Sequence, residues 1–367
     1  VGVIAALSGL SERTAGLTRD ASAVIIGTTH FVNAVVERKR LNRVAAVRIC
    51  LPASSSLPPF VDWPADLREL VRGGVHLLPG GYEVDGREIA PFDDRRMEEV
   101  AREIADSGVG AVAVSSVFSP LRADHELRAA EILARHCPDA VVTLSRDLGR
   151  IGLLERENVA LMNAALTDLA RLTTRAFRGA IEHSGLKARL YLSQNDGTVM
   201  SAETAERNPV LCFSSGPTNS MRGAAFLSGL SDATVIDVGG TTSDIGVLTN
   251  GFPRQANTVV EIGGVRTLFQ IPDVLSLPLG GGTRVRRDPD RLGPDSLGYR
   301  LISEGRVFGG EVLSATDVAV AAGMAAIGDA SRVGDIDDGL NSWFVDEVRR
   351  VLEDGVDAMK TRAGDVP

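Results

Sequence analysis

Residues 235–248 read VIDVGGTTSDIGVL, which is an apolar strand, a glycine-rich turn and a second apolar strand. Gly239 and Gly240 lack side chains and can take positive φ, so successive backbone N–H groups beside them can approach an anion closely. Thr241 and Thr242 add hydroxyl donors to the same turn. The pattern predicts a hairpin that cradles phosphate groups. The alternative is an ordinary tight hairpin whose glycines serve only the turn.

Two acidic residues flank this turn. Asp237 ends the first predicted strand, and Asp244 directly precedes the second, which is predicted at residues 245–248. An ionised carboxylate only accepts hydrogen bonds, so it suits a hydrated Mg²⁺ better than a phosphate group. We therefore predict that Asp237 and Asp244 are catalytic residues that bind Mg²⁺, directly or through water.

The composition indicates a folded protein with more than one domain. The chain has 367 residues, of which 44% are hydrophobic and 24% are charged. Single hydrophobic cores stop growing near about 250–300 residues. The formal charge of -9 provides no basic field for nucleic acid or anionic lipid. A small molecule is the expected partner, with neither nucleic acid nor membrane.

The cysteines and the first residues indicate a cytoplasmic protein. Cys50, Cys137 and Cys212 are odd in number, widely spaced and set among apolar residues, as reduced thiols are. The first residues lack the basic segment of a signal peptide, and no apolar run is long enough to span a bilayer.

Strand patterns alternate with helix patterns through the first half of the chain. Apolar and β-branched runs predict strands at residues 22–26, 43–49, 111–114 and 140–144. Apolar residues at helical spacing predict helices at residues 93–106, 124–136 and 158–180. The alternation predicts βαβ units and a largely parallel sheet. Residues 189–193 read as a further strand, and a last helix carries one apolar face that includes Phe344, Val348, Val351, Leu352, Val356 and Met359.

Three further segments offer groups for a nucleotide or substrate. Gly280-Gly281-Gly282-Thr283 could line an anion with backbone donors, or it could be a flexible loop. Ser215 and Gly216 open a helix whose exposed N–H groups could receive an anion or a substrate carbonyl, or Ser215 could simply cap that helix. Asp317 begins another helical run, either as an N-cap or as an acid that faces the nucleotide site.

Polar residues also follow the first predicted strand. Thr28, Thr29 and Asn33 offer neutral donors and acceptors that suit the amide edge of a ring; the alternative role is to cap the next helix. His125 has no partner at metal-ligand spacing and reads as a structural or surface histidine. The run Glu155-Arg156-Glu157 reads as a solvated helix start.

The hairpin at residues 235–248 resembles the phosphate motif of the actin, sugar kinase and heat-shock chaperone nucleotide-binding superfamily. Other motifs are similar to those of the hydantoinase A/5-oxoprolinase family, and the resemblance covers almost the whole chain. These motifs are Gly27-Thr28-Thr29 with Asn33-Ala34 and Glu37-Arg38, Ser119-Pro120 with His125-Glu126, Glu155-Arg156-Glu157 with Asn163-Ala164, Gln194-Asn195-Asp196-Gly197, and Ser215-Gly216-Pro217 with Gly223-Ala224-Ala225.

The resemblance implies an α/β fold with two ribonuclease-H-like, actin-like ATPase domains around a nucleotide cleft. The expected domains are residues 1–208 and residues 209–367, the second with the phosphate hairpin. ATP and Mg²⁺ are the implied cofactors. Their binding is implied for Gly239, Gly240, Thr241, Thr242, Gly280, Gly281, Gly282, Thr283 and Asp317, and substrate binding for Thr28, Thr29, Asn33, Asn195, Ser215 and Gly216.

The implied activity is ATP-dependent opening of a cyclic amide, such as a hydantoin or 5-oxoproline, through phosphorylation of the amide oxygen. Two alternatives remain open: a subunit of an acetone- or acetophenone-type carboxylase, and a nucleotide-binding regulator that opens no ring. Either a second copy of the chain or a second subunit is the expected protein partner.

The chain departs from the family pattern in two respects. It begins after the family's own first glycine-rich hairpin and stops before a later glycine-rich segment, so we expect it to lack the first strands and a C-terminal segment and to bind ATP weakly. Many large members place a histidine shortly before the second glycine-rich loop, whereas residues 273–284 here read DVLSLPLGGGTR. We therefore expect no metal site at that loop.

Overall fold

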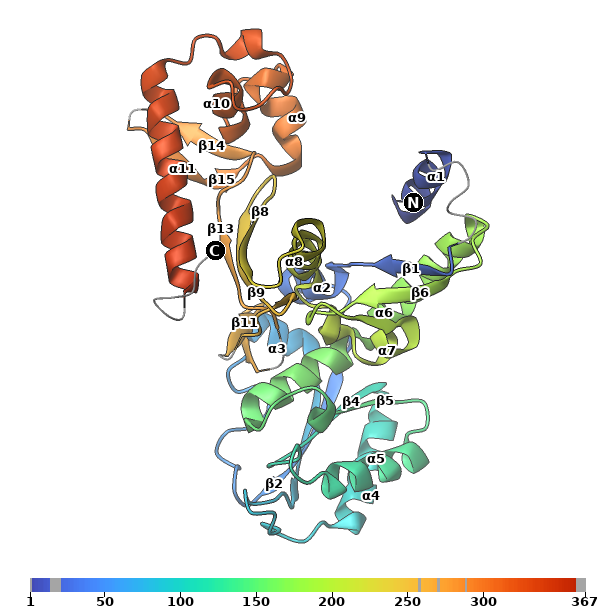
Figure 1. The fold of residues 1–367 in the computed structure, drawn as a ribbon. Coiled ribbons are helices and arrows are strands. Elements are labelled where there is room, and N and C mark those ends of the chain that lie inside the picture. The colour runs from blue at the N-terminus through green and yellow to red at the C-terminus, as the bar shows by residue number, and fades with distance from the viewer. Residues whose placement is uncertain (1, 14–20, 257–258, 269–270, 288, 361–367) are drawn as a thin grey trace. The chain divides into compact units, whose positions relative to one another are not determined.

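The computed structural model describes residues 2–13, 21–256, 259–268, 271–287 and 289–360. The fold is mixed α/β (Figure 1). The chain divides into two compact units, described separately below. Unit 1 contains Val1–Gly216 and Ala256–Ile271, and unit 2 contains Pro217–Gln255 and Pro272–Pro367. The domain boundary at residues 208 and 209 stays a prediction.

The elements before residue 230 alternate between helix and strand as far as β6. They are α1 (Gly2–Arg13), β1 (Ala23–Ile26), α2 (His30–Glu37), β2 (Val44–Leu51), α3 (Ala65–Val71), β3 (Arg72–Pro79), α4 (Asp94–Ser107), β4 (Ala111–Ser116), α5 (Asp124–His136), β5 (Val141–Leu144), α6 (Leu153–His183), β6 (Arg189–Ser193), β7 (Val199–Ser201), α7 (Ala202–Arg207) and α8 (Ser215–Ser228).

The later elements are mostly short strands, followed by a long helix. They are β8 (Ala233–Val238), β9 (Ser243–Thr249), β10 (Phe252–Pro253), β11 (Val260–Ile262), β12 (Val265–Thr267), β13 (Val274–Leu277), β14 (Thr283–Arg286), β15 (Arg291–Ser296), α9 (Leu301–Glu304), α10 (Ala315–Ala321) and α11 (Asp338–Met359).

Unit 1 contains a four-stranded parallel sheet in the order β3-β2-β4-β5, which confirms the prediction of βαβ units. Seven of the eight residues of β2 are buried, as expected for a parallel strand covered on both faces. Ala45 and Val47 pack with Met97 of α4 and Ile132 of α5, whereas Ala46 belongs to the core that includes α6.

A second sheet of unit 1 brings two predicted segments together. β1 and β6 pair in parallel, with Ile26 opposite Leu192, and β7 pairs antiparallel to β6. The residues that follow β1 and β6 therefore lie at the same edge of this sheet. Thr28 and Asn195 both come from those segments.

The strands of unit 2 pair antiparallel, in contrast to the parallel four-stranded sheet of unit 1. β8, β10 and β13 all pair antiparallel to β9, and β14 pairs antiparallel to β15. Only four residues separate β8 from β9, a connection that permits a hairpin but is far too short for a parallel crossover. The apolar face predicted for the last helix is confirmed in α11, where Phe344 and Met359 are buried and Val348, Val351, Leu352 and Val356 are half-buried.

No helix within the described residues is both long enough and apolar enough to span a lipid bilayer.

Candidate active site

The two predicted catalytic carboxylates face each other across the hairpin of unit 2. Asp237 on β8 is the direct antiparallel partner of Asp244 on β9, and Ser276 on β13 pairs with Asp244 from the other side. Directly opposed residues share one face of a sheet, with Cβ atoms about 4.5–5.5 Å apart. The Ser276 hydroxyl donates a hydrogen bond to Oδ1 of Asp244. Asp237, Asp244 and Ser276 therefore form one oxygen-rich row beside the turn.

This row has the chemistry of a cation site. Two like charges directly opposite each other repel, so a bound cation would relieve the repulsion. Mg²⁺ keeps several waters and commonly binds through one or two carboxylates. Asp237 and Asp244 fit that requirement. No group of three or more histidine, cysteine or acidic side chains gathers as a metal site in the described part of the chain.

The second glycine-rich loop lies directly against the turn. The N–H of Gly281 donates to the carbonyl oxygen of Gly239 at 3.0 Å, and the N–H of Gly282 donates to that of Gly240 at 2.7 Å. The N–H of Gly280 donates to Oγ1 of Thr283 at 2.7 Å. The backbone donors that were predicted to hold an anion at this loop are thus engaged within the protein. In this structure the loop stabilises the hairpin through these hydrogen bonds.

The glycines are needed for close approach rather than for positive φ. Neither Gly239 nor Gly240 adopts a positive φ, contrary to the reason given for them from sequence. A Cβ on Gly280 would lie 2.7 Å from the carbonyl oxygen of Gly239 and from the backbone nitrogen of Thr241. Since those are backbone atoms, they cannot move without moving the turn. A Cβ on Gly282 would likewise lie 2.9 Å from the carbonyl oxygen of Gly240, so the steric demand for glycine falls mainly on Gly280 and Gly282.

The turn itself is exposed. The N–H of Gly239 donates to the carbonyl oxygen of Thr242 at 2.9 Å. The N–H groups of Gly240, Thr241 and Thr242 donate to no backbone carbonyl within the described residues. They are the groups of the hairpin that can receive an anion.

The carboxylate of Asp317 is buried and hydrogen-bonded to the backbone. It is fully buried at the third position of α10, where Ser314 is the N-cap, and the two residues form a capping box. Its carboxylate accepts hydrogen bonds from the backbone N–H of Ser314 at 2.7 Å and of Val307 at 2.8 Å. Asp317 lies in the first turn of α10, and Ser314 is the N-cap, so the prediction of Asp317 as an N-cap was wrong. Its oxygens are occupied by the backbone, which favours a structural role over nucleotide binding.

The predicted substrate residues belong to unit 1. Thr28 is buried, and its hydroxyl forms a hydrogen bond with Nδ1 of His30 at 2.7 Å. Asn33 donates from Nδ2 to Oγ1 of Thr29 at 3.3 Å. The Ser215 hydroxyl donates to the carbonyl oxygen of Thr28 at 3.4 Å. The structure thus brings Thr28 and Ser215 together.

The other two substrate candidates can also be located in unit 1. Asn195 is buried after β6, at the edge shared with Thr28, and its N–H donates to the carbonyl oxygen of Leu211 at 2.8 Å. Gly216 follows Ser215 at the start of α8, and a Cβ built on it would meet open space. Close packing does not require glycine at position 216.

A buried ion pair was missed from sequence. Glu157 lies in the first turns of α6 and was expected to be solvated, yet it is 2% exposed. Both of its oxygens accept hydrogen bonds from the guanidinium of Arg48 on β2, with Nε at 2.8 Å from Oε1, and the Ser115 hydroxyl donates to Oε1 at 2.6 Å. The available signal was Arg48 itself, a single charge inside the apolar strand VAAVRICL.

A second buried network lies beside the first. Glu126 is fully buried and accepts hydrogen bonds from the Ser145 hydroxyl at 2.7 Å and from the backbone N–H of Ser116 at 2.9 Å. Arg156, also buried, donates from Nε to the same Ser145 hydroxyl at 2.9 Å. Burial raises the pKa of Glu126 and lowers that of Arg156. The expectation of a solvated helix start was wrong because α6 inserts this segment between two sheets.

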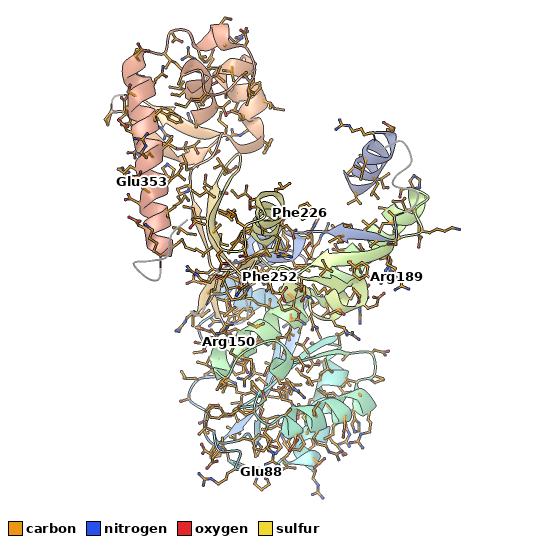
Figure 2. The ribbon with its side chains drawn as sticks, in the orientation of Figure 1. Glu88, Arg150, Arg189, Phe226, Phe252 and Glu353 are labelled. Atoms are coloured by element: carbon orange, nitrogen blue, oxygen red, sulfur yellow. The ribbon has the colours of Figure 1, made fainter. Side chains whose placement is uncertain are left out.

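His125 has a structural environment, as expected. Its Nδ1 accepts a hydrogen bond from the backbone N–H of Gly81 at 3.0 Å, and its ring stacks on Tyr82 with 4.4 Å between centroids. Burial lowers the pKa of His125, an effect that nearby Glu88 (Figure 2) opposes. The three cysteines are free and buried, and burial raises the pKa of the Cys212 thiol to about 12.

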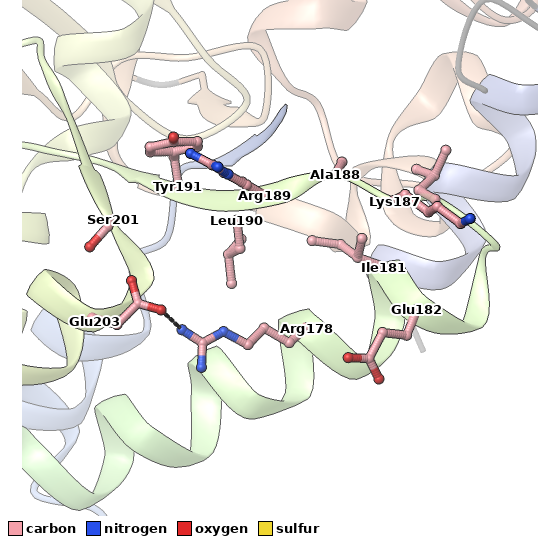
Figure 3. A pocket seen from close by; sticks show the side chains of 11 residues that line it. Arg178, Ile181, Glu182, Lys187, Ala188, Arg189, Leu190, Tyr191, Ser201 and Glu203 are labelled. Carbon is pink, nitrogen blue, oxygen red and sulfur yellow. Dashed lines mark hydrogen bonds and ion pairs between the residues drawn. The ribbon is translucent and has the colours of Figure 1, made fainter. Parts of the chain in front are cut away.

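A cavity of about 680 Å³ in unit 1 contains none of the predicted site residues (Figure 3). Leu190 points from β6 toward α6, where Ile181 forms the facing wall. Arg178 at the other end is paired with Glu203. The ion pair neutralises Arg178, and two further basic residues, Lys187 and Arg189, also line the cavity.

Known sequence families and proteins match this chain. The sequence model of the hydantoinase/oxoprolinase family matches residues 156–352, and that of the hydantoinase/oxoprolinase N-terminal region matches residues 1–137. The chain is 24% identical to caprolactamase subunit alpha of Pseudomonas jessenii over 253 residues, which are 66% of this chain and 36% of that protein. It is 25% identical to the acetophenone carboxylase gamma subunit of Aromatoleum aromaticum over 226 residues, 58% of this chain and 31% of that protein.

The fold is similar to that of a solved relative. The crystal structure of the ATP-dependent caprolactamase from Pseudomonas jessenii matches 97% of this chain and 57% of its own chain, with a TM-score of 0.74 and 20% sequence identity. The chain thus spans about a third of the length of the two curated relatives and little more than half of the solved chain.

Proposed function

Because the chain belongs to the hydantoinase/oxoprolinase family, we propose that it acts in an ATP-dependent enzyme that opens a cyclic amide, such as a hydantoin or 5-oxoproline. The single observation that carries this proposal is the pairing of Asp237 with Asp244 beside the Gly-Gly-Thr-Thr turn. The turn offers backbone donors for phosphate oxygens, and the carboxylates offer ligands for Mg²⁺.

An amide carbon is a poor electrophile, so the reaction needs activation. In the proposed sequence the γ-phosphoryl group of ATP moves to the amide oxygen, giving ADP and an imidate phosphate. Water then adds to the activated carbon and loses its protons to solvent or a base. The C–N bond then breaks, which releases the amine and leaves an acyl phosphate. A second water hydrolyses the acyl phosphate, so the products are an amine, a carboxylate and inorganic phosphate.

The chain's own residues would act mainly by position and charge. Gly240 and Thr241 would hold phosphate oxygens through backbone N–H groups, while Asp237 and Asp244 would fix Mg²⁺, whose charge offsets that of the phosphates. Preorganised charges of this kind supply most of the catalysis in phosphoryl transfer. Thr28, Asn195 and Ser215 remain our candidates for contacts with the amide ring.

ADP release tests the proposal directly. Purified protein, with Mg²⁺ and ATP, is incubated with a panel of hydantoins, 5-oxoproline and simple lactams. We expect at least one cyclic amide to stimulate ADP release and to be consumed in equal amount. If no member of the panel does so, alone or with any co-purifying subunit, the ring-opening function is wrong and a nucleotide-binding regulator becomes the better reading.

Asp244→Asn tests the site. The substitution keeps the size of the side chain and removes its charge, so we expect kcat to fall at least about a hundredfold, the scale seen when one preorganised group is lost. Asp346→Asn, an exposed acid on α11, is the matched control. Steady-state kinetics and circular dichroism of both variants decide the question. A folded Asp244→Asn variant with normal kcat would remove this residue from catalysis.

A carboxylase subunit is the second candidate, favoured by the similarity to the acetophenone carboxylase gamma subunit. It predicts that ADP release depends on bicarbonate and a ketone rather than on a cyclic amide. The same assay with those substrates separates the two functions. For either function we propose a cytoplasmic location, where ATP is available, and cell fractionation tests it.

A further inference from the structure

The cavity of about 680 Å³ in unit 1 is a groove at the edge of the sheet formed by β1, β6 and β7. β7 pairs with β6 only from Tyr191 to Ser193, and Ser201, the last residue of β7, is followed directly by α7. Residues 187–190 therefore have no strand beside them on that side within the described residues. The cavity fills this gap: residues 186–191 form one wall, and α6 and the start of α7 form the others (Figure 3). We call it the β6 groove.

The backbone of β6 offers hydrogen-bonding groups at this gap. The N–H of Arg189 donates to the carbonyl oxygen of Ser22, on the side of β1. Successive residues of a strand direct their backbone groups to opposite edges, so the N–H and the carbonyl of Leu190 point toward the groove. An unpaired strand edge is a template for pairing with another extended chain. The groove can therefore accept a short added strand.

The two faces of β6 differ in character beside the groove. Arg189 and Tyr191 lie on one face, whereas Leu190 lies on the other and points toward Ile181 of α6 (Figure 3). Ile181 is 3% exposed and Leu190 is 7% exposed, so the face toward α6 is an apolar floor. The face of Arg189 is open to solvent.

The charges of the groove are also divided between its walls. Lys187 and Arg189 are exposed, and neither pairs with an acidic side chain in the described part of the chain. On the opposite wall, Arg178 is paired with Glu203, and Glu182 adds a further acid. An acidic side chain of a ligand is therefore favoured on the side of Arg189 and disfavoured against α6.

We propose that the β6 groove binds an extended segment of another polypeptide in which acidic and apolar residues alternate. The segment would add to the free edge of β6 as a short strand. Its apolar side chains would lie over Leu190 and Ile181, and its acidic side chains would lie on the face of Arg189. Because side chains alternate between the two faces of a strand, this order is favoured over a block of acidic or of apolar residues.

Strand addition explains why the groove needs both kinds of group. In this mode of recognition, main-chain hydrogen bonds supply the affinity and alternate side chains supply the specificity. Opposite charges on neighbouring strands stabilise the pairing, and like charges destabilise it. The proposed site uses neither the glycine-rich hairpin nor the candidate substrate residues, so it does not depend on the proposed ring-opening function.

Fluorescence anisotropy with labelled synthetic peptides tests this binding on the whole protein. The probe is a capped peptide of sequence Glu-Val-Glu-Val-Glu. One comparison peptide, Lys-Val-Lys-Val-Lys, reverses the charge, and the other, Glu-Pro-Glu-Pro-Glu, keeps the charge but lacks the N–H donors of its prolines. We expect the first peptide to bind at least about tenfold more tightly than the other two. If it does not bind, or binds no better than either of them, the proposal is wrong.

Charge reversal on β6 tests the position of the site. In the double variant Lys187→Glu, Arg189→Glu we expect the affinity for the acidic peptide to fall at least about fivefold, because cross-strand attraction becomes repulsion. The matched control is Arg171→Glu, Arg175→Glu, which changes the net charge equally at two exposed arginines of α6 outside the groove. If circular dichroism shows that the first variant does not fold, Lys187→Gln, Arg189→Gln replaces it. Wild-type affinity in the folded variant would overturn the proposal.

Hydrogen exchange measured by mass spectrometry locates the bound peptide. We expect slower amide exchange in a fragment that contains residues 187–191 when the acidic peptide is present, because the N–H of Leu190 becomes hydrogen-bonded. Octanoate, an amphipathic anion that cannot form a strand, should neither slow this exchange nor displace the peptide. Displacement by octanoate would mean that the groove takes a small ligand, and unchanged exchange with the peptide would place its binding elsewhere. Either result contradicts strand addition at β6.

Discussion

Arg48 is a fully buried charge whose partner lies 109 residues away in the sequence. Removing only one member of a buried ion pair leaves the other charge without compensation, which costs about 3–5 kcal/mol. We therefore expect Arg48→Met to lower the free energy of unfolding by about 3–5 kcal/mol. Urea denaturation of the variant measures the effect.

Two further variants show whether the broken ion pair causes the loss of stability expected for Arg48→Met. Arg43→Met removes an exposed arginine at the start of the same sheet and should change the free energy of unfolding by less than about 0.5 kcal/mol. Adding Glu157→Leu to Arg48→Met should restore much of the lost stability, because no charge then remains buried. If Arg48→Met alone proves as stable as the wild type, the buried pair contributes nothing.

His125 predicts how stability changes with pH. Burial holds its pKa below the ordinary value near 6.5, so the folded state favours the neutral ring. This contribution is complete above about pH 6.5 and is lost as the pH falls through the folded-state pKa. Burial lowers the pKa of His76 as well, with the same sign. We expect the free energy of unfolding to decrease between about pH 7.5 and 5.5.

Single variants of the two histidines show how much of this decrease in stability comes from each. His125→Asn keeps an acceptor near the position of Nδ1 but cannot titrate, so it should reduce the slope of stability against pH. His76→Asn should leave the part due to His125. Denaturation curves at several pH values, with Glu88 intact, measure both slopes. A slope that His125→Asn leaves unchanged would assign the pH dependence to other groups.

At the scale of elements, the hairpin and the glycine-rich loop act as one assembly. Two hydrogen bonds join them, and a Cβ at Gly280 would meet only backbone atoms. We expect Gly280→Ala to destabilise the protein by about 1–3 kcal/mol, as overpacking does, and to weaken ATP binding by displacing the turn. Gly110→Ala, outside the candidate site, is the control, since a Cβ there meets nothing within 4 Å. Thermal unfolding and ATP titrations measure the stability and the ATP affinity of both variants. Equal values for the two variants would contradict the prediction.

Much of the local structure could be predicted from sequence. The bounds predicted for α5 and β6 agree with the structure, and the helix predicted at residues 158–180 is confirmed within α6. The spacing of apolar residues predicts such helices and strands because it shows that one face of the element is buried. It does not predict which distant segment meets that face, so the salt bridge of Glu157 and the packing of Gly280 against Gly239 could not be found from the local pattern.

The candidate site was predictable only in part. The pairing of Asp237 with Asp244 follows directly from a four-residue connection between two strands. The use of the Gly281 and Gly282 donors inside the fold depends on a contact between residues that are 42 positions apart (281 − 239 = 42), and the local sequence does not predict this contact. Their assignment to the cofactor, like that of the other site residues, stays a prediction.

At the scale of the whole molecule, the C-terminal end of α8 leaves apolar side chains in contact with solvent. Phe226 (Figure 2) is 86% exposed, and Leu227 is 85% exposed. Side chains of this size favour association with a second copy or a second subunit. We expect the double variant Phe226→Ser, Leu227→Ser to associate less at high concentration, with its free energy of unfolding within about 0.5 kcal/mol of the wild type.

Light scattering across a concentration series measures this association. Leu172→Ser, an exposed leucine on α6, is the matched control and should leave the molar mass unchanged. If the double variant and the wild type have the same molar mass at every concentration, the end of α8 is not where copies of the chain meet.

The division of the chain into units has a consequence for its synthesis. Unit 1 is interrupted after Gly216 and completed only by Ala256–Ile271, which contribute Ile262 and Val265 to its core. From residue 216 to residue 271 the ribosome must add 271 − 216 = 55 residues, which takes about 3–11 s at typical elongation rates. During that interval the nascent unit 1 lacks part of its own interior, while residues 217–255 of the other unit are being synthesised. A nascent chain stalled before residue 256 should therefore be far more sensitive to protease than one stalled well beyond residue 271.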